Sequence, residues 1–382
     1  MSPPPLSGLR IIELASIGPG PFACMMLADH GADVIRVERI GGGAAGPSIP
    51  PEKDILLRSR KTIRIDLKSS AGREVLLDLL RDADGLVEGY RPGVLERLGL
   101  APETLFAINP RLVIGRMTGW GQTGPMAQMA GHDLNYIAIS GALHGVGPKD
   151  GKPVIPLNLF GDFGGGGMLL AFGMLAAMMG AKSTGRGQVV DAAMTDGSAL
   201  LMSMIHTFRQ IGLWQDRRGV NMLDGGSHFY DTYETADGKH VTIGAIEPQF
   251  YASLLDLLGL SEDPAFAAQM DSESWDDLRA RLAGIFRSRT RDEWDSLLMG
   301  TDTCYAPVLS MEEAVEHPHN RDRGTFTSAA GIVQPAPAPR YSVSLPVAPR
   351  MFTGTTDTDE ILKGVDYPLE RITALRRDGI VT

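Results

Sequence analysis

The sequence predicts an α/β protein with two domains, a large one built on a parallel sheet and a smaller one of α+β type. The first observation is that short β-branched runs alternate with helical patterns over residues 1–120, which is typical of βαβ units. The second is an Asp-Gly turn signal at 237–238 between two apolar runs, followed by three helical patterns. A chain of 382 residues is long enough to bury a core in each domain.

In the large domain we expect a Rossmann-like sheet whose short apolar strands are separated by helices. The expected strands lie at 9–14, 34–38, 62–67, 85–88 and 112–116. The expected intervening segments are a helix at 21–30 closed by Gly31, a glycine- and proline-rich loop at 41–51 and a helix at 71–81. Right-handed crossovers would bring the loops after the strands to one edge of the sheet, where such folds bind ligands.

The rest of the chain is expected to finish this domain, build the smaller one and return. The expected elements are a helix at 168–180, a turn at 183–187, a strand at 188–192, a helix at 196–212, a two-residue hairpin joining strands 230–233 and 240–243, and helices at 249–258, 274–287 and 291–299. The predicted division is a large domain (1–193), a linker helix (194–226), a small α+β domain (227–320) and a return segment (321–382) that is proline-rich at 333–350.

Composition excludes several classes of function. A net charge of −10 and a pI near 5.3 argue against sequence-independent binding of nucleic acid, which needs a basic face. Cys24 and Cys304 lie far apart and have no metal-ligand spacing, which fits a reducing compartment such as the cytoplasm. The N-terminus lacks the pattern of a secretory signal.

The uncharged run from Phe163 to Ala181 is nominally long enough to span a membrane. Its first part holds four consecutive glycines, 164–167, which we expect not to be helical. The remaining apolar part has the length of a buried core helix, so we expect no membrane span.

Two glycine-flanked segments carry the residues of chemical interest. His132 lies in Gly-His-Asp-Leu-Asn-Tyr (131–136), and Asp162 lies in Gly-Asp-Phe-Gly-Gly-Gly-Gly (161–167). A histidine and a carboxylate of this kind can remove and return a proton next to a carbonyl group. Glu247, in Gly-Ala-Ile-Glu-Pro (244–248), is a third candidate. The sequence therefore indicates acid/base chemistry on an acyl carbon.

Each of these residues also has a structural explanation. His132 is at a predicted helix start, where Asp133 would cap the helix that carries Tyr136. Asp162 would cap the helix after the glycines, and Glu247 would cap the helix at 249–258 with Pro248 in its first position. A cap and a catalytic role are compatible, because a helix start presents oriented N–H groups to a developing oxyanion.

Six basic residues flank the predicted strands and favour an anionic ligand at the sheet, although solvated surface arginines are common. They are Arg39, Arg58, Arg60, Lys61, Lys68 and Arg91. The dinucleotide-like run Gly18-Pro-Gly20-Pro-Phe-Ala23, with Glu38 twenty residues after Gly18 at the end of the next strand, is a weaker signal. Its two prolines remove N–H groups that would hold a pyrophosphate.

The chain resembles the α-methylacyl-CoA racemase branch of the family III CoA-transferase superfamily. The resemblance rests on the segments 88–94, 116–125, 131–136, 161–167, 244–251 and 301–309 and runs from residue 6 to about 340. It implies that His132 and Asp162 are two bases on opposite faces of the α-carbon of a thioester. It also implies that Glu247 orients His132 and that the backbone N–H of Asp133 stabilises the enolate oxygen.

The same resemblance implies the substrate and the assembly. CoA would lie along Arg39, Ile65, Asp66, Leu67, Lys68, Gly89, Arg91 and Tyr136. The substrate would be an acyl-CoA thioester, with no metal and no further cofactor. The family forms an interlocked homodimer in which each site lies between the large domain of one subunit and the small domain of its partner.

Two alternatives remain at this point. In the CoA-transferases of the superfamily the aspartate that matches Asp162 attacks the thioester as a nucleophile. His132 and Glu247 favour the racemase reaction, because a transferase needs no second base. A non-catalytic acyl-CoA-binding module is the other alternative, and it predicts that changing His132 or Asp162 leaves function intact.

Overall fold

The computed structural model describes residues 2–41 and 49–382, and it divides the chain into two compact units. Unit 1 comprises 1–140, 157–201 and 322–382, and unit 2 comprises 141–156 and 202–321. The division differs from the predicted one in two places. Residues 141–156 group with unit 2, and the segment predicted as a linker helix at 194–226 is divided between the units at Met202. The predicted loop at 41–51 falls mainly outside the described residues.

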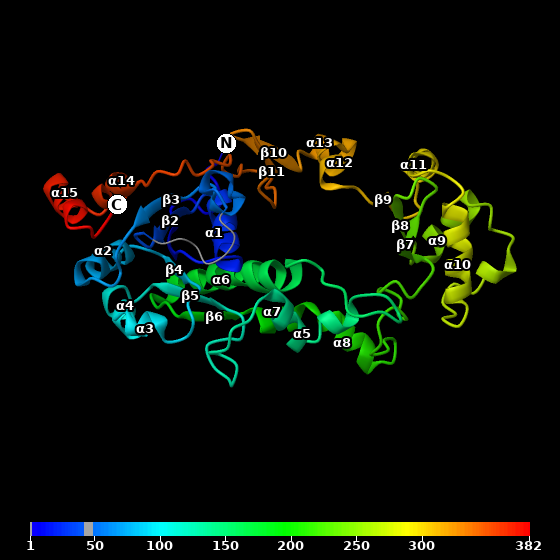
Figure 1. The fold of residues 1–382 in the computed structure, drawn as a ribbon, viewed down its shortest axis with the longest axis horizontal. Helices are drawn as coiled ribbons and strands as arrows, with labels where there is room; N and C mark the ends of the chain where they lie inside the picture. Colours follow the sequence, from blue (N-terminus) through cyan, green and yellow to red (C-terminus); the bar gives the residue numbers. More distant parts are fainter. Residues whose placement is uncertain (1, 42–48) are drawn as a thin grey trace. The chain divides into compact units, whose positions relative to one another are not determined.

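Unit 1 contains the parallel sheet (Figure 1). Its strands are β1 (Arg10–Leu14), β2 (Asp33–Glu38), β3 (Lys61–Arg64), β4 (Gly85–Glu88), β5 (Val113–Thr118) and β6 (Val189–Ala193), with a separate hairpin of β10 (Phe326–Ala329) and β11 (Ile332–Pro335). Its helices are α1 (Pro19–Asp29), η1 (Pro51–Lys53), η2 (Ile55–Leu57), α2 (Ser70–Leu80), α3 (Val94–Arg97), α4 (Pro102–Ile108), α5 (Asp133–Ile139), the π-helix η4 (Leu159–Met168), α6 (Leu169–Thr184), α7 (Met194–Leu201), α14 (Thr358–Lys363) and α15 (Leu369–Arg377).

The six strands are all parallel and lie in the order β3-β2-β1-β4-β5-β6, which confirms the predicted α/β class. The order of strands in the chain reverses between β1 and β4. Ligands in open parallel sheets bind in the crevice beyond the carboxyl ends of the strands at such a reversal. The loops that follow β1 and β4, at 15–18 and 89–91, are therefore the first place to look for a site.

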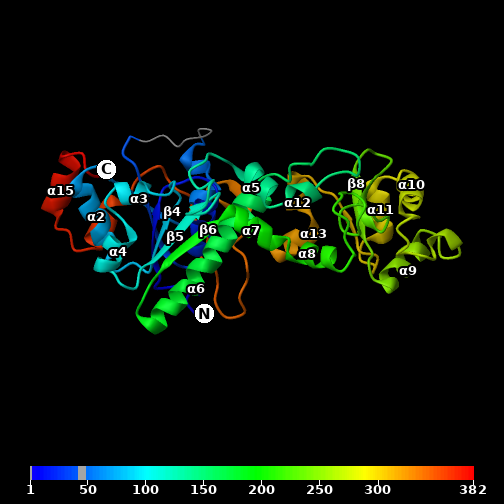
Figure 2. The same ribbon diagram turned by 90° about the horizontal axis from the view of Figure 1, so that it is seen from below.

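The sheet is covered on both faces, as its nearly continuous apolar strands require. Alternate residues of one strand point to opposite faces, so Ile11 belongs to one core and Ile12 to the other. One core packs against α1 and α6, and Figure 2 shows α6 running beside β5 and β6. The other packs against α2, α4, α14 and α15.

The glycine block at 164–167 is helical, contrary to the prediction. It lies in the π-helix η4, which runs without interruption into α6. A Cβ on Gly165 would lie 2.6 Å from the backbone N of Ser198 in α7, and one on Gly167 would lie 2.8 Å from the carbonyl O of Pro19 in α1. Glycine is helical here because only a surface without side chains fits between these two helices, and that packing outweighs its poor helix propensity.

Because η4 and α6 form one helix, residues 159–184 are long and apolar enough to cross a membrane by length and composition. The length argument made from the sequence was therefore wrong. In the most apolar stretch 44 % of the helix is buried within unit 1. The buried apolar residues of this helix pack against α1, β5 and β6 in the core of unit 1.

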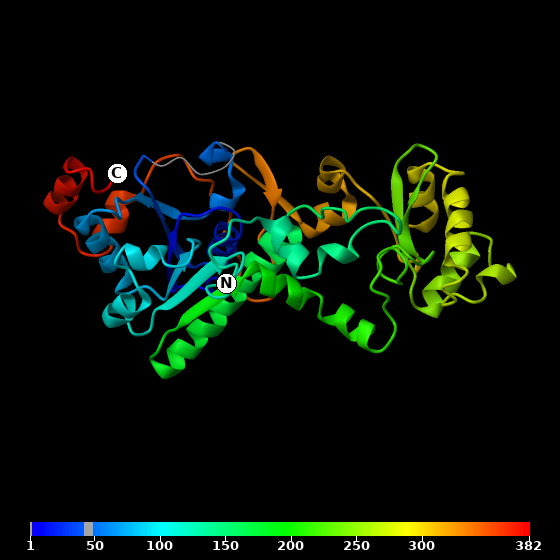
Figure 3. The ribbon, with the colours of Figure 1, turned by 60° about the horizontal axis from the view of Figure 1, so that its bottom comes forward.

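The C-terminal part of unit 1 returns to the sheet. Backbone hydrogen bonds join Val347 to Asp29, and Ser59 to Arg350. At the end of the chain Ile65 pairs with Val381 beside β3, and the phenol of Tyr367 donates to Asp78 of α2. The red C-terminal helices accordingly lie beside α2 in Figure 3.

Unit 2 is built around a three-stranded antiparallel sheet in the order β7-β8-β9. Its strands are β7 (Tyr230–Glu234), β8 (His240–Gly244) and β9 (Tyr305–Pro307). Its helices are η3 (Leu143–Gly145), α8 (Ser203–Gln210), α9 (Pro248–Leu257), η5 (Pro264–Phe266), α10 (Trp275–Phe286), α11 (Arg291–Leu298), α12 (Met311–Glu316) and α13 (Pro318–Arg323), the last of which ends in unit 1. Aromatic side chains of β7, α10 and α11 fill its core.

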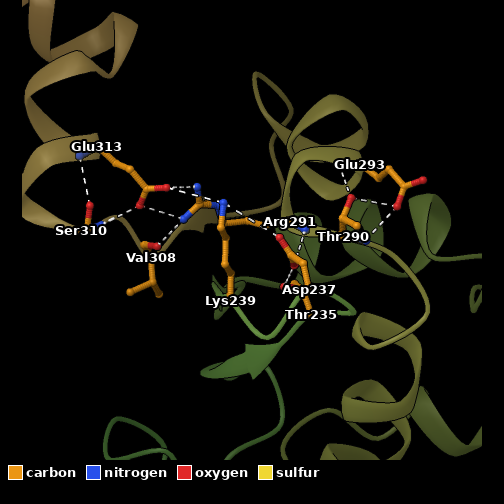
Figure 4. A network of polar contacts seen from close by, with 9 residues as sticks. All are labelled: Thr235, Asp237, Lys239, Thr290, Arg291, Glu293, Val308, Ser310 and Glu313. Atoms are coloured by element: carbon orange, nitrogen blue, oxygen red, sulfur yellow. Dashed lines mark hydrogen bonds and ion pairs between the residues drawn. The ribbon is translucent and has the colours of Figure 1, made fainter.

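The hairpin between β7 and β8 has a three-residue loop rather than the predicted two-residue turn. The N–H of Thr235 donates to the carbonyl of Lys239 at 2.9 Å, and Gly238 takes the left-handed conformation with φ +72°. The loop is held by Asp237, whose Oδ1 accepts from the N–H of Arg291 at the start of α11 (Figure 4). Arg291 in turn pairs with Glu313 of α12 at 2.5 Å, so one network joins the hairpin to two helices.

Candidate active site

His132 and Asp162, predicted from separate segments, are both placed in unit 1 around one buried carboxylate. Asp133 is only 6 % exposed, and its Oδ2 accepts hydrogen bonds from the backbone N–H groups of Gly161 (2.7 Å) and Asp162 (2.8 Å). His132 directly precedes this aspartate in the chain. The two glycine-flanked segments of the sequence therefore meet through Asp133.

Asp162 lies inside the π-helix η4 rather than at its cap, so the predicted capping role is wrong. Its half-buried carboxylate accepts a hydrogen bond from Asn158 Nδ2 at 2.9 Å, one helical turn earlier. Burial raises the pKa of this carboxyl, and the negative charge of Asp133 adds to the rise. The hydrogen bond from Asn158 and the charge of His132 act in the opposite direction. Asp162 is thus a more basic carboxylate than an exposed one.

The loop after β1 approaches Oδ2 of Asp162, the same oxygen that accepts the hydrogen bond from Asn158. A Cβ placed on Gly18, whose φ is +70°, would lie 3.4 Å from Asp162 Oδ2. The dinucleotide-like run therefore has a structural role in this protein. Gly18 leaves room for the carboxylate of Asp162, and Pro19 begins α1. Ser16 in the same loop lies against Gly89 after β4. Asp162 consequently lies at the reversal of strand order between β1 and β4.

His132 is the N-cap residue of α5, one position earlier than the predicted cap Asp133, which is instead the first helical residue. The N–H of His132 donates to Asn135 Oδ1 at 2.9 Å, which fixes the helix start. The imidazole is exposed. The N–H of Asp133 has no hydrogen-bond partner among the described residues, as expected at a helix start.

Tyr136, which the resemblance assigns to CoA, is largely buried in the same helix. Its ring packs edge-on against Trp120, with centroids 4.7 Å apart, and its hydroxyl donates to the carbonyl of Gly131. A Cβ on Gly119 would lie 2.0 Å from the ring, so glycine is required there. Burial raises the pKa of the phenol, and the charge of Asp162 adds to the rise.

Three of the predicted basic residues follow strand ends with exposed side chains. Arg39 follows β2, Lys68 lies four residues after β3, and Arg91 lies three residues after β4. Between them, Gly89 is exposed, Asp66 Oδ1 accepts from the N–H of Lys68 at 3.1 Å, Leu67 packs on the core and Ile65 is only 1 % exposed. At Ile65, therefore, the backbone rather than the side chain is what a ligand could contact.

The other three basic residues are wrong as ligand candidates. They precede or begin β3 and so lie toward the amino end of that strand, opposite the carboxyl ends. Arg58 is 2 % exposed and pairs with Asp29 at 2.5 Å, while Arg60 pairs with the buried Glu13. Lys61 pairs with Asp33 and Glu360, at 3.2 and 3.0 Å. Their charges hold the fold together instead of facing a ligand.

Glu247 lies in unit 2 as the exposed N-cap residue of α9, with Pro248 in the first helical position as predicted. Its side chain makes no capping hydrogen bond, so the purely structural explanation is incomplete. Its charge adds to the burial that raises the pKa of the Cys304 thiol. The hydrogen bond between Glu247 and His132 stays a prediction, as do the roles assigned to Asp162 and the CoA-binding residues.

Sequence reasoning missed three contributors to the site, namely Asn158, Gly18 and the carboxylate of Asp133. Asn158 and Asp162 are four residues apart, which would have paired them on one helix face had the segment been predicted helical. In the sequence Gly18 has a meaning only as part of a nucleotide-binding motif. Among the described residues no group of three or more His, Cys, Asp and Glu side chains is arranged to hold a metal ion.

Comparison with known proteins places this site in a family. The profile of CoA-transferase family III matches residues 6–353. The chain is 43 % identical to a Mus musculus protein and 42 % identical to a Homo sapiens protein, both named alpha-methylacyl-CoA racemase, over 98 % of this chain and 97 % of each relative. A crystal structure of a CAIB/BAIF family protein from Brucella suis matches with a TM-score of 0.81 and 26 % identity, over 95 % of this chain and 99 % of that one. The chain belongs to CoA-transferase family III.

Proposed function

We propose that the protein is a racemase that interconverts the (2R) and (2S) epimers of 2-methylacyl-CoA thioesters. The observation that carries the acid/base chemistry is the Asp133 bridge between the segments of His132 and Asp162. The similarity to the two named racemases, which extends over almost the whole chain, supports the choice of substrate.

In the proposed mechanism Asp162 and His132 face opposite sides of the α-carbon. One removes the α-proton and the other returns a proton to the opposite face, so that the two roles exchange in the reverse direction. The raised pKa of Asp162 brings it closer to that of an imidazole, which suits a reaction that runs both ways.

A thioester α-proton is too weakly acidic for either base without stabilisation of the enolate. The unpartnered N–H of Asp133 is proposed to donate to the enolate oxygen. One such donor typically stabilises a developing oxyanion by about 3–4 kcal/mol in a site that excludes water. Glu247 is proposed to orient the imidazole of His132 by accepting a hydrogen bond from it.

The CoA moiety is proposed to lie along the carboxyl ends of β2, β3 and β4. Arg39, Lys68 and Arg91 would pair with its phosphates, and the backbone from Ile65 to Leu67 together with Gly89 would line the adenosine end. Support comes from the exposure of these three cations and from their place after the carboxyl ends of β2, β3 and β4, the last of which borders the reversal of strand order. Tyr136 would limit the other end of the groove.

The active form is proposed to be a homodimer acting in the cytoplasm, without a metal or additional cofactor. An exposed apolar stripe on η4 and α6, formed by Met168, Phe172 and Met179, supports a surface that a second copy covers. The two cysteines are unpaired, which fits a reducing compartment. Sedimentation equilibrium tests the dimer, and activity after dialysis against EDTA tests the metal-free reaction.

The decisive experiment is incubation of one epimer of a 2-methylacyl-CoA with the protein in D₂O, followed by proton NMR and chiral analysis. Deuterium at the α-position together with the other epimer would support the proposal. Under it, His132→Ala and Asp162→Asn should each reduce inversion by about 100-fold or more.

CoA transfer is the alternative within the family, because Asp162 is a carboxylate that could attack the thioester. It predicts no α-exchange, but passage of CoA to an added free acid. It also predicts that Asp162→Asn abolishes turnover whereas His132→Ala does not. A protein that binds acyl-CoA without either reaction would contradict both functions.

A further inference from the structure

The carboxylate of Asp133 has an environment that capping a helix does not explain. It is 6 % exposed, and one oxygen, Oδ2, accepts both of its hydrogen bonds, from the successive N–H groups of Gly161 and Asp162 in another segment. Its other oxygen, Oδ1, is buried without a hydrogen-bond partner among the described residues. A buried anion with unused acceptor capacity is expensive, so a neutral side chain would serve stability better.

The partner segment is shaped to receive this carboxylate. A Cβ on Gly161 would lie 2.5 Å from Asp133 Oδ2 and 3.2 Å from Asp133 Cα. Any side chain at 161 would therefore push the two segments apart. The close approach of α5 and η4 depends on a glycine on one side and an aspartate on the other.

We infer that the Asp133 carboxylate is a positioning residue that fixes the distance between the two bases of the proposed reaction. His132 is the residue before Asp133, and Asp162 is the second of the two residues whose N–H groups it holds. One side chain thus ties together the two backbones that carry the bases. This role is separate from that proposed for the Asp133 N–H, and it rests on the proposed function.

The inference has a specific kinetic consequence. Inversion requires both bases to reach the same carbon, because one removes the proton and the other delivers deuterium to the opposite face. Exchange with retention needs only one base, which removes the proton, exchanges it with D₂O and returns deuterium to the same face. Loosening the distance between the bases should lower inversion more than it lowers exchange with retention.

The experiment measures the ratio of exchange with retention to inversion for each epimer in D₂O. For Asp133→Ala we expect the ratio to rise at least about tenfold, since a misplacement near 1 Å can cost about 100-fold in rate. Asp133→Asn keeps an oxygen in the Oδ2 position and should return the ratio to within about twofold of that of the unchanged protein. The ratio does not depend on how much of the sample is folded, so a merely structural role would leave it unchanged.

Asn109→Ala is the matched control. Asn109 is also 6 % exposed, and its Nδ2 joins two backbone segments of the same unit by bonds to Leu80 O (2.9 Å) and Ala83 O (2.8 Å), before β5. Its removal should lower stability and leave the ratio as it is. If Asp133→Ala does not fold, Gly161→Ala makes the same test. The new Cβ at residue 161 displaces the Asp133 carboxylate, although Asp133 itself is unchanged.

The outcomes separate the inference from the proposed function. If the unchanged protein inverts its substrate but neither Asp133→Ala nor Gly161→Ala raises the ratio, the positioning role is overturned and the racemase reaction stands. If the unchanged protein shows neither exchange nor inversion, the proposed function is overturned and the inference with it.

Discussion

The contact between Gly197 of α7 and Gly165 of η4 offers a sharp test of how Asp162 is held. A Cβ on Gly197 would lie 1.9 Å from the carbonyl oxygen of Gly165, whereas ordinary contacts begin at 3.4 Å. Because the three atoms nearest the new methyl group are all backbone atoms of Gly165, no side chain can rotate away. Gly197→Ala must therefore separate the two helices by roughly 1.5 Å, in an interior that is packed as densely as a crystal.

The expected loss has two parts. Overpacking of this kind costs about 1–3 kcal/mol of the free energy of unfolding. Since η4 carries Asp162 three residues before Gly165, the shift also moves the carboxylate, and a displacement near 1 Å is expected to reduce the inversion rate by about 100-fold. The first part is measured by urea unfolding and the second by chiral analysis at saturating substrate.

Gly180→Ala is the control for this change. Gly180 lies in α6, the continuation of the same helix, and a Cβ there would have nothing within 4 Å. It should stabilise the protein by about 0.5–1 kcal/mol, because alanine replaces glycine inside a helix, and leave the inversion rate unaltered. A Gly197→Ala variant with the rate and stability of the unchanged protein would refute the argument that backbone contact positions Asp162.

Three further predictions concern stability. Burial lowers the pKa of His228 to about 4, so the folded state keeps it neutral; its contribution is complete above the ordinary value of 6.5 and is lost as the pH falls toward 4. Lowering the pH from 7.5 to 5 should reduce the free energy of unfolding of unit 2 by about 2 kcal/mol. Tryptophan-monitored urea unfolding should show no such pH dependence in His228→Gln. An identical pH dependence in the variant would exclude His228 as its source. The Arg291 guanidinium lowers the pKa of Glu313 to about 2, so Glu313→Gln should reduce the urea midpoint at pH 7, with a difference that shrinks between pH 4.5 and 2; a constant difference would contradict the ion pair. Asp29→Asn leaves the buried Arg58 unpaired and should destabilise by about 3–5 kcal/mol, and a change below 1 kcal/mol by the same measurement would count against that burial.

The sheet could be predicted from the sequence because its strands are short apolar runs, which are typical of strands buried on both faces. Each of the six predicted strands coincides with an observed one to within about three residues at either end. The site residues His132 and Asp162 were found because glycine flanks a titratable group, and the structure brings their segments together through a side chain that the sequence had assigned a different task.

What the sequence could not supply depends on contacts between distant segments. Gly165 and its neighbours read as a break in a helix, because local propensity does not reveal that α1 and α7 leave no room for side chains. Arg58 was predicted to face an anionic ligand because nothing near it in the chain shows that Asp29 and Gln334 enclose it. The hydrogen bond from Asn158 to Asp162 could not be predicted, because it depends on the segment being the helix η4.

The way the chain closes unit 1 has a consequence for synthesis on the ribosome. Unit 2 is assembled from residues up to 321, whereas one core of unit 1 needs Ile361, Leu362, Ile372 and Val381, and the sheet edge at β3 is covered by the residues around 381. When the residues up to 321 have emerged, unit 2 has every residue it requires, whereas the face of the unit 1 sheet that packs on α2, α4, α14 and α15 is covered only by α2 and α4. We expect unit 2 to fold before unit 1, with part of the unit 1 sheet accessible to chaperones until residues 358–382 have emerged.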